Sequence, residues 1–284
     1  MSERKTFFES LEPKSALLVG LATGFLSLCT IGFFVLGAIT LRNGGFGGGS
    51  SNTANATPNN AVATNNQREV QPPDPSIPKA DKPSVELFVM SHCPYGLQSQ
   101  KALVPAWELL KNKANIDVKF VDYIMHGPTE KDDNNVEYCL QKEQGDKYIP
   151  FLKCFTASGD SKACLNSVRV NQGKLNNCIA SADRQFAINS EFNNTAHYLS
   201  GRYPLYNVHK DLNEKYQVQG SPTLVINGVV ANADRSPEGM KQAICASFKN
   251  PPKECQQVLS TSQASPGFGT QAAGNDTANA GCAT

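Results

Sequence analysis

The chain has 284 residues, 40% hydrophobic residues and a formal net charge of +1 at pH 7. This near-neutral balance lacks the concentrated basic surface that nucleic-acid binding requires, and the length allows one or two domains. Nine cysteines are many for a cytosolic protein of this size, and six of them lie between Cys139 and Cys255. That usage favours an oxidising compartment and a disulfide framework.

The first predicted element is an apolar stretch from Ser15 to Leu41 that contains no charged residue. About 26 helical residues at roughly 1.5 Å each are enough to cross a hydrocarbon core of roughly 30 Å. A cleaved signal peptide is the rival interpretation, but its apolar region is shorter, roughly 7–15 residues, and is followed by a small-residue cleavage site. More basic residues precede the stretch than follow it closely. We therefore expect a single-pass membrane protein whose residues 1–14 are cytoplasmic and whose remainder is extracytoplasmic.

Composition then divides the rest of the chain. Residues 42–83 are rich first in Gly, Ser and Asn and then in Pro, which is typical of a flexible linker that becomes stiffer. The folded domain is expected at residues 84–256. Residues 257–284 are again poor in large apolar residues and are expected to be a disordered tail.

Within the domain, hydrophobic periodicity predicts both strands and helices. In chain order these are a strand at 85–90, a helix at 96–113, a strand at 116–120, a mostly helical region at 134–198 with four cysteines, a helix at 206–217, a hairpin at 223–230 and a helix at 237–248. The turn of the hairpin, Asn227-Gly228, is typical of a two-residue connection. A strand–helix–strand unit normally implies parallel pairing of its two strands.

Cys93 lies between the first predicted strand and the first predicted helix, in the run SHCPYG at residues 91–96. At a helix N-terminus, unpaired amides and the positive end of the helix dipole stabilise a thiolate, so Cys93 is placed to act as a nucleophile. Pro94 suits the first helical turn, where its missing N–H has no partner to lose. The alternative is a buried structural cysteine. His92, if protonated, would favour the thiolate, but it is equally compatible with a merely exposed side chain.

Ser221 and Pro222 directly precede the predicted hairpin. A proline that enters a strand is a candidate for a cis peptide bond. Taken alone this signal is weak, because most bonds that precede proline are trans.

Together these features resemble the thioredoxin-like superfamily, and the helical, cysteine-rich insertion before the proline is similar to the DsbA branch. A pattern of the GILT thiol reductases, His-Gly-x-x-Glu-x-x-x-Asn-x-Val-Glu-x-Cys, is matched at every position from His126 to Cys139. The resemblance covers about residues 85–245. It implies an α/β thioredoxin-like domain in which Cys93 is the catalytic residue. It also implies a substrate-binding surface formed by Pro94, Tyr95, Ser221 and Pro222.

Gly96 departs from that resemblance, because these families usually carry a second cysteine at this position. The second thiol normally attacks the mixed disulfide and releases the substrate. Without it, Cys93 can still form a mixed disulfide, but a small thiol such as glutathione, or another cysteine, must resolve it. We therefore treat Gly96 and His92 as candidate modulators of Cys93.

The six cysteines from Cys139 to Cys255 are expected to be structural. Cys154 and Cys164 flank one polar loop, and Cys245 and Cys255 flank a pair of prolines. Local bridges across both loops leave Cys139 with Cys178, but six cysteines allow other connectivities, and one of them could instead resolve Cys93. No metal site is expected, since no paired Cys-x-x-Cys spacing occurs.

The sequence supports a membrane-anchored thiol–disulfide oxidoreductase or isomerase that acts on cysteine-containing secreted or membrane proteins. It uses no cofactor other than a small thiol co-substrate. A degenerate thioredoxin-like module that binds partners without turnover is the alternative. An iron–sulfur carrier of the monothiol glutaredoxin kind is a third, less compatible with an extracytoplasmic location.

Overall fold

The computed structural model describes residues 75–270. The predicted membrane span at 15–41, most of the predicted linker and residues 271–284 lie outside the described residues. The chain divides into two units, residues 1–64 and 65–284, and all described residues belong to the second. Among residues 75–270, no helix combines the length and the apolar character that crossing a bilayer demands.

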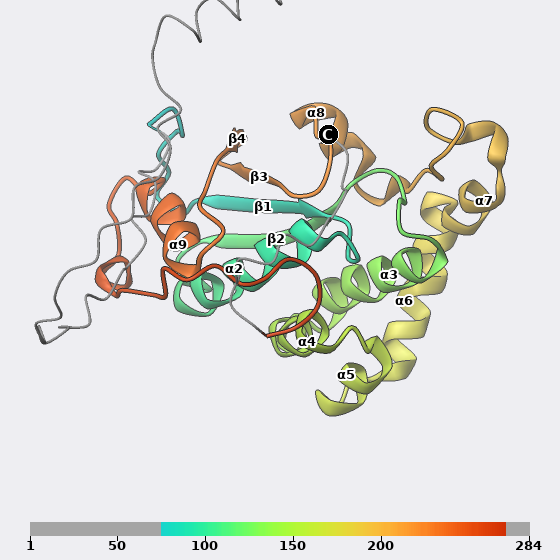
Figure 1. Ribbon diagram of the computed structural model, residues 1–284, viewed down its shortest axis with the longest axis horizontal. Coiled ribbons are helices and arrows are strands. Elements are labelled where there is room, and N and C mark those ends of the chain that lie inside the picture. The colour runs from blue at the N-terminus through green and yellow to red at the C-terminus, as the bar shows by residue number, and fades with distance from the viewer. Residues whose placement is uncertain (1–74, 271–284) are drawn as a thin grey trace, which may run out of the picture. The chain divides into compact units, whose positions relative to one another are not determined.

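The described domain contains four strands, eight α-helices and short 3-10 turns, coloured in chain order in Figure 1. They are β1 (Ser84–Val89), α2 (Pro94–Leu110), β2 (Asn115–Phe120), α3 (Pro128–Glu143), α4 (Gly145–Ser158), α5 (Ser161–Ser167), α6 (Gln172–Phe186), α7 (Ile188–Asn193), η2 (Thr195–His197), η3 (Asn207–His209), α8 (Lys210–Tyr216), β3 (Thr223–Ile226), β4 (Val229–Ala231), α9 (Pro237–Ala246) and η4 (Lys253–Gln256).

The four strands form one sheet in the order β2-β1-β3-β4. β1 pairs with β2 in parallel, as the strand–helix–strand pattern predicts, and β3 pairs antiparallel with both β1 and β4. Asn227 and Gly228 both have positive φ, which is the conformation that a tight hairpin turn requires. This topology is a mixed α/β, thioredoxin-like fold with a long helical region between β2 and β3.

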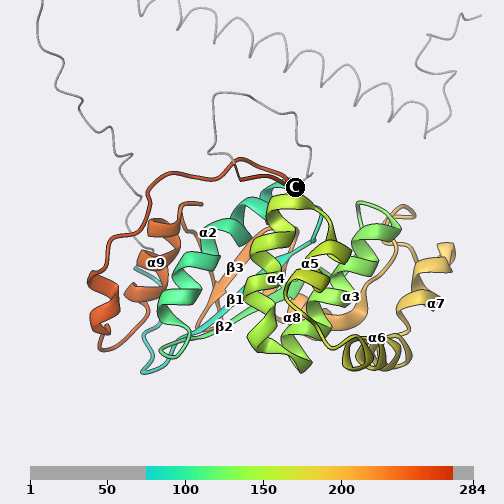
Figure 2. The ribbon, with the colours of Figure 1, turned by 90° about the horizontal axis from the view of Figure 1, so that it is seen from below.

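The two faces of the sheet are covered by different helices (Figures 1 and 2). Alternate residues of a strand point to opposite faces, and the side chains of Val85, Leu87 and Val89 lie in the core shared with α2 and α9. Phe88 points to the other face, where its ring meets that of Tyr216 in α8 with centroids 6.0 Å apart. β1 is therefore buried on both sides, and its carboxyl end leads directly into the turn that carries Cys93.

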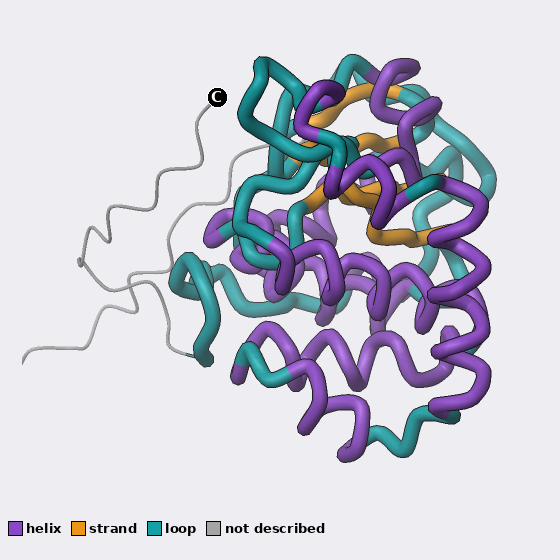
Figure 3. Tube along the Cα trace, turned by 90° about the vertical axis from the view of Figure 1, so that its right-hand side faces the viewer, coloured by secondary structure: helices purple, strands orange, loops and turns teal. Residues whose placement is uncertain are grey.

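The helical region between β2 and β3 packs beside the sheet rather than extending it (Figure 3). Three disulfides secure this region and the C-terminal part of the domain: Cys139–Cys178 joins α3 to α6, Cys154–Cys164 joins α4 to α5, and Cys245–Cys255 joins α9 to η4. This is the pairing that local bridging suggested among the open alternatives. Each such bridge typically contributes about 2–4 kcal/mol by restricting the unfolded chain.

The domain is larger than composition predicted at both ends. Residues 75–83, expected to belong to the linker, pack on the domain: Ile77 is buried, and Ala80 exchanges backbone hydrogen bonds with Ser247 and Lys249. At the other end, disorder was expected from residue 257, but residues 257–270 are hydrogen-bonded to α2, α4 and α9. We call residues 257–270 the C-terminal strap.

Candidate functional site

Cys93 occupies the N-cap of α2, immediately after the end of β1. Its backbone N–H donates to the carbonyl of Met90 at 3.0 Å, and its own carbonyl accepts the first helical hydrogen bond, from Leu97 N–H, at 2.8 Å. Pro94 is the first helical residue, as the sequence predicts. The strand end and the helix start therefore fix the Cys93 backbone from both sides.

The Cys93 thiol faces the residue that precedes Pro222. Its Sγ lies 3.4 Å from the carbonyl oxygen of Ser221, to which the thiol donates, and the Ser221–Pro222 peptide bond is cis. Two motifs that stand 128 residues apart thus meet at one point. Cys93 is fully buried and is the free cysteine of the described residues.

The orientation of the thiol has a chemical consequence. The Cys93 side chain makes no capping hydrogen bond with the first-turn amides of α2, because it donates to Ser221 instead. The thiol therefore lies at the helix N-terminus, where unpaired amides stabilise negative charge, without bonding to those amides.

Gly96 is needed for close packing against Ser221. A Cβ added at Gly96 would lie 2.6 Å from Ser221 Oγ, 3.1 Å from the Met90 carbonyl oxygen and 3.3 Å from Cys93 Cβ. Ser221 Oγ in turn accepts a hydrogen bond from Met90 N–H at 2.9 Å. The serine hydroxyl thus takes the room that a second cysteine would need, and Gly96 and Ser221 form a matched pair.

The turn before Cys93 is held by one face of α3. His92 Nε2 lies 2.8 Å from the Asp133 carboxylate, and Asn134 Oδ1 accepts from Ser91 N–H at 3.1 Å. The Ser91 hydroxyl donates to the carbonyl of Glu130 at 3.3 Å. His92 is therefore oriented by an acidic partner and is not merely exposed.

The same helix face explains the matched pattern from His126 to Cys139. The buried carboxylate of Glu130 accepts from the backbone N–H groups of Met125 and His126 and pairs with the His126 ring. Further along, Glu137 Oε2 accepts from Gln100 and Tyr148. Burial raises the pKa of Glu137 to about 8, so this side chain is largely protonated at neutral pH. These roles come from tertiary contacts, which spacing in the sequence did not reveal.

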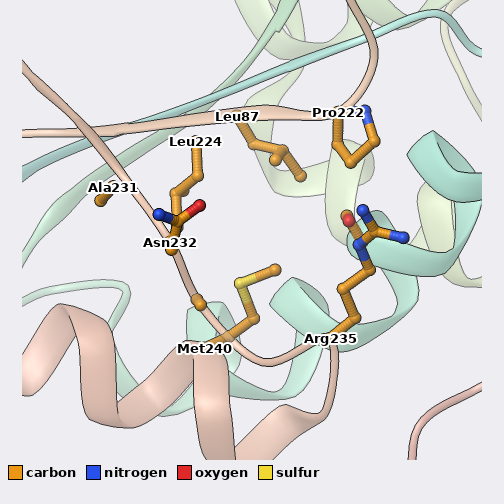
Figure 4. A pocket seen from close by; sticks show the side chains of 9 residues that line it. Leu87, Pro222, Leu224, Ala231, Asn232, Arg235 and Met240 are labelled. Atoms are coloured by element: carbon orange, nitrogen blue, oxygen red, sulfur yellow. The ribbon is translucent and has the colours of Figure 1, made fainter. Parts of the chain in front are cut away.

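A small pocket of about 80 Å³ is lined in part by Pro222 (Figure 4). Its walls include Pro222, Asn232 and Arg235. The Arg235 guanidinium lies 5.0 Å from the centre of the Tyr95 ring and donates to Gln98 Oε1 at 3.3 Å. Tyr95, which packs against the cluster that contains Cys93, thus has the positive charge of Arg235 over its ring, a feature that the sequence did not indicate.

The C-terminal strap covers part of the predicted substrate surface. Gly267 N–H donates to the carbonyl of Pro94 at 2.9 Å, and the ring of Phe268 meets that of His92 edge-on with centroids 5.4 Å apart. Figure 1 shows the strap crossing α2 and ending beside α4. Sequence reasoning missed it because the strap has no periodic apolar pattern. Among residues 75–270, no group of three or more metal-ligating side chains occurs.

No protein-family model and no curated protein matches the chain. Solved structures similar to it include the oxidoreductase NmDsbA1 from N. meningitidis, at 15% identity and a TM-score of 0.36, covering 58% of this chain and 81% of that one. BdbD from Bacillus subtilis is similar at 17% identity and a TM-score of 0.39, covering 64% and 92%. The disulfide bond oxidoreductase DsbG from Mycobacterium tuberculosis is similar at 12% identity and a TM-score of 0.43, covering 63% and 89%.

NmDsbA1 is named as an oxidoreductase and DsbG as a disulfide bond oxidoreductase, and at such identities the likeness concerns the fold alone. The function has to be inferred from the chain's own site.

Proposed function

We propose that this chain is a membrane-anchored, extracytoplasmic thiol–disulfide oxidoreductase or isomerase that acts through a single nucleophilic cysteine, Cys93. The observation that carries the proposal is the position of the Cys93 thiol, at the N-cap of α2 and 3.4 Å from the carbonyl that precedes cis Pro222. The other six cysteines of residues 75–270 are paired in disulfides, which leaves Cys93 as the reactive thiol there.

The chemistry is thiol–disulfide exchange. The Cys93 thiolate attacks one sulfur of a substrate disulfide, the substrate S–S bond breaks, and the second substrate sulfur leaves as a thiolate that takes up a proton. A further thiol then attacks the Cys93–substrate disulfide. When glutathione attacks Cys93 Sγ, the second substrate thiol leaves, and a second glutathione reduces the resulting Cys93–glutathione disulfide, so the substrate gains two electrons and glutathione disulfide is formed. Attack by another thiol of the substrate instead rearranges its disulfides without net electron transfer.

Exchange requires that Cys93 be uncovered, since its side chain is fully buried in a cluster with Phe88 and Tyr123. This burial, together with glycine at position 96, favours the second candidate function, a thioredoxin-like module that binds partners without turnover. The two candidates differ in one property: the oxidoreductase has a Cys93 that reacts while the domain is folded.

The proposed location, on the extracytoplasmic side of a membrane, is inferred from the sequence. The apolar stretch at 15–41 supports an anchor, and the three disulfides of the domain are compatible with an oxidising compartment. The substrates proposed are cysteine-containing secreted or membrane proteins, and the anchor would keep the domain near them.

The proposal is tested with a protein substrate whose disulfides have been scrambled. The full-length chain should restore the native pairing when reduced glutathione is present, and Cys93→Ser should abolish this activity. Ser190→Ala, a change at an exposed serine of α7 outside the site, serves as the control and should retain this activity. Equal activity of the parent and Cys93→Ser would contradict the proposed function.

A further inference from the structure

The C-terminal strap is attached to the domain in two different ways along its length. Its first part, residues 257–263, is fixed to α9. The Lys241 ammonium donates to the carbonyl of Gln257 at 2.6 Å. The Glu238 carboxylate accepts from Leu259 N–H at 2.6 Å, and the Leu259 side chain packs against the hydrophobic core. This first part is therefore anchored by side-chain packing as well as by hydrogen bonds.

The second part of the strap, residues 264–269, is held through its backbone, and we call it the strap tip. The Lys101 ammonium of α2 donates to the carbonyls of Ser265, Gly267 and Gly269 at 2.7, 2.8 and 3.0 Å. Further bonds run from Gln98 Nε2 to the Ala264 carbonyl, from Gly267 N–H to the Pro94 carbonyl and from Gly269 N–H to the Thr156 carbonyl, at 2.8, 2.9 and 3.0 Å. Backbone groups are common to all residues, so these contacts recognise a polypeptide that is free of helix and sheet rather than particular side chains.

Two glycines allow the strap tip to turn alternate carbonyls toward one ammonium group. Gly267 and Gly269 have φ angles of 76° and 120°, a region that residues with a side chain rarely adopt. A Cβ added at either position would meet nothing within 4 Å, so conformation rather than lack of space favours glycine there. The segment that fits Lys101 therefore has glycine on both sides of the residue between them, Phe268.

Phe268 supplies the aromatic ring of the strap tip. This ring meets those of His92 and Phe155 edge-on, with centroids 5.4 and 5.3 Å apart. Gly159, at the end of α4, leaves room for it, because a Cβ there would lie 3.3 Å from the Phe268 ring. The ring stays 37% exposed, so the tip lacks the buried apolar anchor that the first part of the strap has in Leu259. A segment with so little apolar burial opens at low free-energy cost.

The strap tip lies against the residues on both sides of the proposed nucleophile (Figure 1). Pro94 directly follows Cys93, and His92 directly precedes it. A substrate segment bound in place of the tip would therefore lie beside the residue that carries the thiol, with its carbonyls on Lys101. Such a segment and the tip need the same donors, so they cannot be bound together.

We propose that the surface beneath the strap tip is a binding site for an unfolded segment of a substrate protein with an aromatic residue next to glycine, and that the tip occupies this site until substrate displaces it. The inference rests on the proposed function. It adds a substrate class, unfolded chains with exposed aromatic residues, and an autoinhibitory role for the tip. A tethered competitor acts at an effective concentration of roughly millimolar, so the tip excludes weakly binding segments and yields to tightly binding ones.

The binding test uses the full-length chain in detergent and a fluorescein-labelled peptide with the sequence of residues 263–270, which contains no cysteine. Gly267→Pro releases the tip, because proline has no N–H to donate to Pro94 and cannot adopt a φ of 76°. Fluorescence anisotropy should show the peptide bound at least about tenfold more tightly to Gly267→Pro than to the parent, because the tethered competitor has left. Phe268→Ala, which removes the ring contacts alone, should give a smaller increase.

Matched changes show whether Lys101 recognises the peptide. In the Gly267→Pro background, Lys101→Met keeps the aliphatic stem, removes the ammonium and should weaken peptide binding about tenfold or more. Lys111→Met, at an exposed lysine that follows the same helix, should leave binding unchanged. Thr270→Ala, at an exposed residue that ends the strap, should bind the peptide as the parent does.

The reactivity of Cys93 then shows whether the site serves substrate. Two disulfides are compared by mass spectrometry after acid quenching. One is an unfolded protein with scrambled disulfides and aromatic residues, and the other is oxidised glutathione, which has no aromatic residue. Gly267→Pro should speed mixed-disulfide formation at Cys93 by a factor about tenfold larger with the protein than with glutathione.

Four outcomes would overturn the inference while the proposed function stands. They are equal peptide affinity in the parent and Gly267→Pro, no measurable binding to either, a Lys101→Met change without effect, and equal acceleration with both disulfides. A Cys93 that reacts with neither disulfide in any variant would overturn the proposed function itself, and with it the assignment of the site to substrate.

Discussion

Replacing Glu137 with glutamine probes a carboxyl group buried where α2, α3 and α4 meet. Glu137 is fully buried, and its Oε2 accepts from Gln100 Nε2 at 3.1 Å and from the Tyr148 hydroxyl at 2.9 Å. Burial raises its pKa from 4.5 to about 8, and the charge of Asp133 acts in the same direction, against the two hydrogen bonds.

The sign of the effect follows from proton binding. Between pH 4.5 and about 8 the folded chain holds a proton on Glu137 that the unfolded chain lacks, so the free energy of unfolding falls as pH rises. The stabilisation that comes from protonated Glu137 in the folded chain is complete below pH 4.5 and is lost by the time pH passes about 8. At 1.36 kcal/mol per pKa unit, the shift corresponds to a loss of about 5 kcal/mol.

Glutamine has no charge to acquire, and its side-chain oxygen can still accept from both donors. Glu137→Gln should therefore match the parent near pH 4.5 and exceed its stability by several kcal/mol at pH 8. Urea unfolding followed by the fluorescence of Trp107, the single tryptophan, is the assay, because its ring lies 5.7 Å from that of Tyr148. Glu143→Gln, an exposed carboxylate at the end of the same helix, is the control. Identical pH dependence in parent and Glu137→Gln would refute the reasoning.

Three further predictions concern the acid limb of stability and the surroundings of the thiol. Burial lowers the pKa of His209 to about 3, so the stability that depends on its neutral ring is present above pH 6.5 and is lost as pH falls toward 3. His209→Asn should reduce this loss of stability at acid pH in the same fluorescence assay, and an unchanged loss would contradict the prediction. Gly96→Cys alone should cost about 1–3 kcal/mol, because its Cβ would crowd the Ser221 hydroxyl, whereas adding Ser221→Ala should relieve the crowding and let a disulfide form with Cys93. Thiol counting checks this, and two free thiols in the double variant would count against it. Asp133→Asn should slow the reaction of Cys93 with oxidised glutathione about fivefold, the equivalent of the lost hydrogen bond to His92 at about 1 kcal/mol. The change should be largest where the wild-type rate depends most on pH. An unaltered pH–rate profile would rule out a role of Asp133 in positioning His92.

Much of the fold could be predicted from local patterns. The alternation in β1 and β2, the Asn227-Gly228 turn and the strand–Cys-Pro–helix run each specify their own backbone through nearby residues. The approach of Cys93 to the Ser221–Pro222 bond could be predicted as well, because the order of these residues along the chain resembles a known fold. The predicted membrane span stays a prediction, since it lies outside the described residues.

What the sequence could not supply depends on contacts between distant segments. From the sequence alone, Gly96 indicates a missing cysteine. The structure shows that Ser221, 125 positions later, occupies the space beside it. The strap has the composition of a disordered tail, yet a single ammonium group, that of Lys101, holds three of its carbonyls. Backbone carbonyls carry no sequence signal, so only the folded domain reveals such a clamp.

The central claim is that Cys93 reacts as a nucleophile while the domain is folded. The direct test is a full-length chain with Cys29→Ser and Cys282→Ser, which leaves Cys93 as its single unpaired cysteine, mixed with a disulfide-bonded peptide. Mass spectrometry then compares how fast Cys93 forms a mixed disulfide in the folded chain and in the urea-unfolded chain. We expect one peptide per chain, attached at Cys93, forming faster in the folded state. A Cys93 that reacts only after unfolding would be a buried structural cysteine, and the proposed function would be wrong.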